Sequence, residues 1–134
     1  MRITLPSGTP AEIDTSVANP KMGLVIAPDI FGLRPLFADL VSRLANEWQM
    51  AVIAVDPFPG KELSPDVNER FAEMAKLDDN VHLRDLTEAA DALSVDRVGL
   101  IGFCMGGMYC FKAARSDRFE KISSFYGMIH VPEG

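Results

Sequence analysis

Residues 98–107 read Val98-Gly99-Leu100-Ile101-Gly102-Phe103-Cys104-Met105-Gly106-Gly107, an apolar run that ends in a cysteine set among glycines. The apolar part is typical of a buried β-strand, and the residues that follow predict a helix over 105–115. Gly102, Gly106 and Gly107 would allow strand and helix to approach closely, because a side chain at these positions would collide with its neighbours. The segment therefore has the form of a nucleophile elbow, Gly-x-Cys-x-Gly.

Cys104 is the residue that such a turn presents above the sheet. Its sulfur would lie at the amino end of the 105–115 helix, where the partial positive charge of the backbone favours the reactive thiolate. The alternative is a small buried hydrophobe, the usual role of a free cysteine and the one expected for Cys110. A dinucleotide-binding loop is less well supported, because Gly102-x-Cys104-x-x-Gly107 lacks the middle glycine and lies outside the first strand-helix unit.

The remaining pattern places this segment in an alternation of strands and helices. Residues 22–27 and 51–55 are continuous apolar runs, typical of strands buried on both faces, and a helix that begins near Pro35 is predicted between them. A hairpin is expected around residues 6–10, and a last strand over 122–126. Two further helices are predicted between residues 55 and 98, and they are separated from each other near residues 78–80. The first of them carries the apolar stripe Val67, Phe71 and Met74. The alternation predicts an α/β fold with a mostly parallel sheet of about six strands and flanking helices.

Composition and charge narrow the class of protein. A chain of 134 residues allows one domain, and 48% hydrophobic with 24% charged residues is ordinary for a soluble globular domain. The net charge of −6 and the scattered basic residues argue against nucleic acid as a partner. The apolar runs are far shorter than the roughly 20 residues of a membrane helix, and the first residues lack a secretory signal, so a cytoplasmic location without membrane contact is expected. Two cysteines do not make a disulfide framework.

Several motifs together resemble those of the dienelactone hydrolases, cysteine members of the α/β-hydrolase fold. Besides the elbow they are Ile26-Ala27-Pro28-Asp29-Ile30-Phe31-Gly32, Ala54-Val55-Asp56 and Ser123-Ser124-Phe125-Tyr126-Gly127. The resemblance implies a hydrolase that cleaves a small-molecule activated carboxylic ester or lactone, with Cys104 as nucleophile and a thioester intermediate. It implies no metal and no cofactor.

The same resemblance implies roles for further residues. The backbone amides of Ile30 and Met105 would form the oxyanion hole, which agrees with where the general fold puts these donors. Asp29 stands where the family has a glutamate that helps to deprotonate the resting thiol; a turn carboxylate is the alternative. Family members hold a substrate carboxylate with arginines, but Arg70 does not align cleanly with them, and an exposed helix face is expected for it.

The acid and the histidine of a catalytic triad are not recognisable. In α/β-hydrolases they follow the nucleophile on later strand-end loops, and only thirty residues follow Cys104. Asp117 is predicted at the wrong end of the sheet, His130 one strand too early, and His82 at a helix start.

We therefore expect residues 1–134 to form a single domain that corresponds to the N-terminal part of an α/β-hydrolase, with the later strands and the triad Asp and His missing. The strand at 122–126 would then be an exposed sheet edge through which the chain associates. The alternative function is a catalytically inactive, hydrolase-like fragment that binds a ligand or a protein. A flavodoxin-like or nucleotide-binding domain is a further possibility, since a fold does not fix a function.

Overall fold

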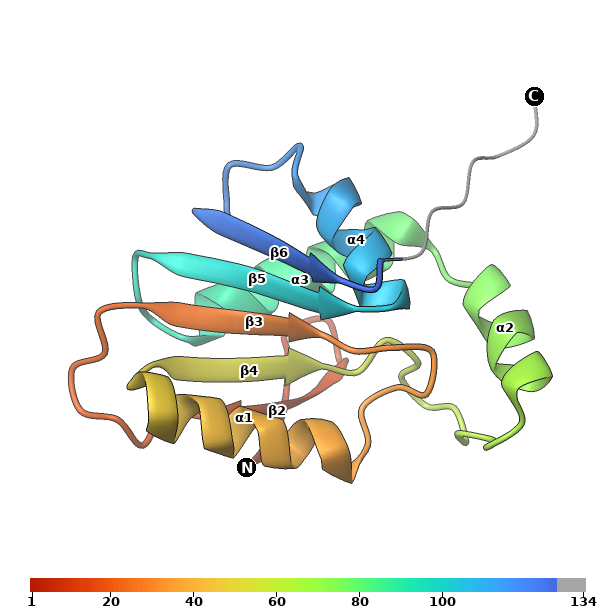
Figure 1. Ribbon diagram of the computed structural model, residues 1–134, viewed down its shortest axis with the longest axis horizontal. Coiled ribbons are helices and arrows are strands. Elements are labelled where there is room, and N and C mark those ends of the chain that lie inside the picture. The colour runs from red at the N-terminus through yellow and green to blue at the C-terminus, as the bar shows by residue number, and fades with distance from the viewer. Residues whose placement is uncertain (128–134) are drawn as a thin grey trace.

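Six strands form one sheet with helices on both of its faces (Figure 1); the computed structural model describes residues 1–127. The strands are β1 (Arg2–Thr4), β2 (Pro10–Asp14), β3 (Gly23–Ala27), β4 (Ala51–Val55), β5 (Val98–Phe103) and β6 (Lys121–Phe125). The helices in this part of the chain are α1 (Pro35–Trp48), α2 (Val67–Ala75), α3 (Asp79–Ala92) and α4 (Met105–Ala113).

The strand order is β1-β2-β4-β3-β5-β6. Strands β4, β3, β5 and β6 are mutually parallel, whereas β2 pairs antiparallel with both β1 and β4. The predicted mostly parallel sheet is confirmed, and so is the hairpin at its start. Strand β6 lies at one edge of the sheet and β1 at the other. Because β4, β3, β5 and β6 are parallel, their carboxyl ends lie along the same side of the molecule.

The core lies on both faces of the sheet, which explains the unbroken apolar runs of the central strands. Every residue of β3 and β4 is buried. Alternate residues of a strand point to opposite faces, so Val25 and Ala27 pack with α3 and α4, whereas Leu24 and Ile26 pack with α1. The same division of helices is visible in Figure 1.

Helix α2 differs from the prediction. Its proposed apolar stripe is not its buried face, because Val67 is 48% and Phe71 41% exposed. The helix lies beyond the carboxyl ends of β3 and β4 and not on a face of the sheet (Figure 1). Its apolar stripe therefore has no sheet to pack against. The break between α2 and α3 is confirmed: Asp66 and Asp78 cap the two helices, each accepting hydrogen bonds from two backbone amides.

Other boundaries differ by a few residues. Strand β5 covers Val98–Phe103, and α4 ends at Ala113 rather than Arg115. Strand β2 ends at Asp14, where the Ser16 amide and hydroxyl donate to the Asp14 carboxylate and turn the chain away from the ladder. None of the helices in residues 1–127 has the length and hydropathy to cross a membrane.

Candidate active site

The turn between β5 and α4 holds Cys104 in a strained backbone conformation. Its φ of 57° and ψ of −112° lie in a region that residues with a side chain rarely adopt. Hydrogen bonds hold it from both sides: the Cys104 amide donates to the Phe125 carbonyl at 2.9 Å, and the Cys104 carbonyl accepts from the Met108 amide at 3.1 Å. The predicted sharp turn from strand to helix is therefore present, supported by the neighbouring strand β6.

The three glycines leave no room for side chains. A Cβ atom on Gly106 would overlap the Ala27 carbonyl at the end of β3, and one on Gly102 would overlap the Gly106 carbonyl. A Cβ on Gly107 would lie 2.6 Å from the Ser124 hydroxyl oxygen on β6. The first turn of α4 therefore packs directly against the backbone at the ends of the parallel strands, as the sequence predicted.

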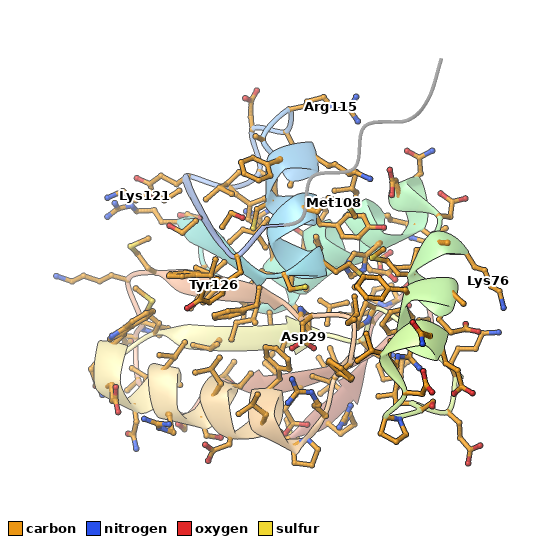
Figure 2. All side chains as sticks on the ribbon, turned by 45° about the vertical axis from the view of Figure 1, so that its right-hand side comes forward. Asp29, Lys76, Met108, Arg115, Lys121 and Tyr126 are labelled. Atoms are coloured by element: carbon orange, nitrogen blue, oxygen red, sulfur yellow. The ribbon has the colours of Figure 1, made fainter. Side chains whose placement is uncertain are left out.

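The Cys104 side chain is partly exposed and borders a cleft of about 310 Å³. The other residues that line this cleft come mainly from α1 and the strand ends: Asp29, Leu36, Phe37, Asp39, Leu40, Arg43, Phe103 and Tyr126. In Figure 2, Asp29 and Tyr126 mark its position. The cleft is largely apolar, with two carboxylates and one arginine among its side chains.

Cys110 has the opposite environment. It is 1% exposed, its sulfur lies 3.5 Å from the Ser123 carbonyl oxygen, and burial raises the pKa of its thiol to about 12. The predicted core position of Cys110 is confirmed, and its thiol stays protonated at neutral pH.

Asp29 begins the turn that follows β3. Its carboxylate accepts a hydrogen bond from the Phe31 amide at 3.0 Å and pairs with Arg34 at 2.7 Å, while its carbonyl accepts from the Gly32 amide. Gly32 has a φ of +78°, a conformation that glycine adopts without strain. Asp29 is thus a turn carboxylate, and it also lines the cleft at Cys104.

Two backbone amides that directly follow the cleft residues Asp29 and Cys104 in the sequence have no hydrogen-bond partner within residues 1–127. Met105 is the first residue of α4, so its amide has no acceptor within the helix. In residues 1–127, the Ile30 amide donates no hydrogen bond either. A Cβ on Gly106 would also come within 2.7 Å of the Pro28 carbonyl oxygen, so the first turn of α4 adjoins the segment that leads into Ile30. Such amides are able to bind a developing negative charge.

The described residues bring no histidine to the Cys104 cleft. His82 lies in α3, is 3% exposed and meets the Tyr109 ring edge-on at 4.5 Å between centroids. It borders a different cleft of about 270 Å³, formed by α2, α3 and the loop after β4. Asp117 lies in the turn between α4 and β6, at the amino end of β6, and His130 lies outside the described residues.

The expected exposed position of Arg70 is wrong. Arg70 is 1% exposed, its Nε donates to the Ile30 carbonyl at 2.9 Å, and its guanidinium lies 4.5 Å from the centre of the Phe58 ring. The sequence favours a solvent-exposed helix face for this arginine. The face of α2 that carries Arg70 instead packs against the turn after β3. No local sequence signal marks this contact, because its partners are distant in the chain.

A mostly parallel sheet whose strand β5 turns through a strained cysteine into a helix is an α/β-hydrolase architecture. The chain belongs to the dienelactone hydrolase family, whose model matches residues 10–133. A Klebsiella pneumoniae protein assigned as a dienelactone hydrolase superposes with a TM-score of 0.85 at 21% identity, over 100% of this chain and 62% of that one. This likeness supports the fold.

Curated relatives carry the name carboxymethylenebutenolidase. One from Cupriavidus pinatubonensis is 29% identical over 77% of this chain and 44% of its own length. One from Pseudomonas putida is 28% identical over 90% of this chain and 54% of its own length. The chain thus spans about half the length of the curated relatives it matches.

Proposed function

We propose that this chain supplies the nucleophile and the oxyanion-binding amides of an enzyme that hydrolyses activated carboxylic esters or lactones. The observation that carries the proposal is the strained conformation of Cys104 at the amino end of α4, with its side chain on a cleft. The names of the curated relatives agree with a lactone as substrate.

The chemistry is nucleophilic. The Cys104 thiolate adds to the carbonyl carbon, and the Ile30 and Met105 amides bind the oxygen as it becomes negative. The tetrahedral intermediate then expels an enolate or a phenolate, which takes a proton, and a thioester remains on the sulfur. Water cleaves the thioester to a carboxylic acid and restores the thiol. Simple alkyl esters suit this nucleophile less, because the intermediate expels thiolate in preference to alkoxide.

The proton of the resting thiol needs an acceptor, and we propose Asp29 for this role. Its carboxylate lines the same cleft, and its bonds to the Phe31 amide and Arg34 fix its orientation. Fast cleavage of the thioester needs a histidine, and among residues 1–127 none reaches the cleft. We propose that the acid and the histidine come from a polypeptide segment outside residues 1–127 that joins at the β6 edge, where Phe125 is 46% and Tyr126 90% exposed.

A single-turnover experiment tests the nucleophile without requiring that histidine. The 134-residue chain is mixed with p-nitrophenyl acetate, and nitrophenolate release is followed by stopped-flow absorbance. We expect a burst stoichiometric with protein, then slow turnover, and an acetyl group on Cys104 in peptide mass spectra. Cys104→Ala should abolish the burst. Cys110→Ala is the matched control and should keep it, since that thiol is buried and protonated.

The alternative is a ligand- or protein-binding module with no chemistry at Cys104. It is favoured if the wild-type chain binds the ester without a burst, or if acetyl groups appear only on surface lysines. Either result would refute Cys104 as a nucleophile.

A further inference from the structure

Arg70 makes an unusual contact for a residue of a peripheral helix. It is the buried residue of α2, although it carries a full positive charge. Within residues 1–127 it forms no ion pair, and one of its terminal nitrogens has no hydrogen-bond partner. Burial of an unpaired cation is unfavourable, so the fold places it here at the expense of stability. Its contacts with Phe58 and Ile30 show which segments the buried guanidinium connects.

Both contacts of the guanidinium lie at the carboxyl ends of parallel strands. Its face packs on the Phe58 ring, in the loop after β4, at 4.5 Å, within the range of a cation–π contact. Its Nε donates to the Ile30 carbonyl, in the turn after β3, at 2.9 Å. Arg70 thus links α2 and the β4 loop to the turn that carries one of the two candidate oxyanion-binding amides.

The peptide group between Ile30 and Phe31 is held at both ends. Arg70 binds its carbonyl, and the Asp29 carboxylate binds its N–H at 3.0 Å. Both bonds involve a charged side chain, and such hydrogen bonds are shorter and stronger than neutral ones. The Asp29 carbonyl in turn accepts from the Gly32 amide, which closes the turn. The Ile30 carbonyl and the amide that follows it are therefore both fixed by charged side chains.

We propose that Arg70 is a positioning residue for the oxyanion hole: by holding the Ile30 carbonyl, it keeps the Ile30 amide aimed at the substrate carbonyl oxygen. This inference rests on the proposed function. Arg70 is not among the residues that line the Cys104 cleft, so its effect passes through the turn. A donor to an oxyanion acts only when it is oriented in advance, and loss of one donor lowers rates by about 100–1,000-fold.

The test compares two reactions of the same sulfur. Acylation by an ester passes through an oxyanion, whereas alkylation by iodoacetamide displaces iodide directly and forms none. In the 134-residue chain, Arg70→Met should slow acylation by p-nitrophenyl acetate by about 10–100-fold, since the amide is misplaced rather than removed. Alkylation should stay within about twofold of wild type, because it makes no use of the amide. Arg115→Met, an exposed arginine beyond the end of α4 (Figure 2), is the control and should change neither rate.

A second ester separates positioning from direct substrate binding. The anionic mono-p-nitrophenyl succinate should lose the same factor as the neutral acetate in Arg70→Met. A loss confined to the anionic ester would mean that Arg70 binds a substrate carboxylate, and would overturn the proposal. So would unchanged acylation, or an equal loss in alkylation, which would indicate collapse of the whole site.

Arg70→Lys keeps the test decisive if Arg70→Met does not fold. Lysine retains the buried charge but not the fixed planar geometry of the guanidinium. Acylation should then fall several-fold with alkylation unchanged, and equal acylation rates would overturn the proposal. If the wild-type chain shows no burst at all, the proposed function fails first, which is seen before any variant is compared.

Discussion

His82 should make the chain lose stability as the pH falls from 7 to 5. The ring lies between α3 and α4, and its Nε2 has no hydrogen-bond partner within residues 1–127. Burial lowers the pKa of His82 to about 4, against the opposing influence of Asp85 and Asp79. In the unfolded chain the ordinary value of 6.5 applies. Between these values the unfolded chain binds a proton that the folded chain excludes, so acid favours unfolding.

The size of the effect follows from the two pKa values. The free energy of unfolding is unaffected by His82 above pH 6.5, falls as the pH drops below that value, and reaches its full loss near pH 4. Proton linkage gives a loss of about 2 kcal/mol between pH 7 and pH 5 and about 3 kcal/mol in the acid limit. For a domain of this size, that is a large part of the usual free energy of unfolding.

Urea unfolding followed by far-UV circular dichroism at pH 7, 6 and 5 measures this loss. The comparison is with His82→Phe, which keeps a ring against Tyr109 but does not titrate. Asp14, whose pKa is lowered by hydrogen bonds from Ser16, titrates below this range. Asp56, whose pKa is raised by burial, acts in the opposite sense in both proteins. The difference between the two slopes therefore isolates His82. Parallel slopes would refute the buried, neutral imidazole.

Two further predictions concern packing and buried polar contacts. Gly106→Ala should destabilise the chain by about 3 kcal/mol or prevent folding, because the added Cβ would overlap backbone atoms. In the control Gly99→Ala on β5, the added Cβ would lie 3.4 Å from the nearest atom, so the free energy of unfolding should change by less than about 1 kcal/mol. Equal urea midpoints for the two variants would contradict this prediction. Thr9→Val removes the hydroxyl that donates to the buried Asp85 carboxylate at 2.7 Å and should cost about 1–3 kcal/mol by urea unfolding. The control Thr87→Val loses only a bond to its own helix and should cost less than about 0.5 kcal/mol; a similar loss in both variants would show that the buried bond is not special.

The sequence predicts the parts of this fold that local rules govern. The β4 run at 51–55 is recognisable because a strand buried on both faces needs apolar residues at every position. The break between α2 and α3 is marked by Asp78, whose side chain is suited to capping a helix. The Cys104 turn is predictable because glycine is required where backbones touch, and three glycines around one cysteine leave few other structures.

Long-range contacts are what the sequence does not reveal. Arg70 bonds to Ile30, forty residues away, and nothing around either residue records the other. His82 is buried because Tyr109 of α4 covers it, which depends on how two helices pack. In both cases the burial of a polar side chain depends on a contact with a segment that is distant in the sequence. Such residues become visible only when the tertiary structure is known.

The conformation of Cys104 argues that its side chain, and not its backbone, is what this position contributes. A residue with a side chain at a φ of 57° outside the ordinary regions costs about 1–3 kcal/mol, and glycine would adopt the same turn with less strain. The neighbouring positions 102, 106 and 107 already hold glycine, because sterics demand it. Position 104 alone in this turn combines a strained backbone with a polarisable, partly exposed sulfur. Cys110, six residues on, shows that the fold also has an unstrained core position for the same side chain. Packing therefore does not explain Cys104, which agrees with the nucleophilic role that we propose for its partly exposed sulfur.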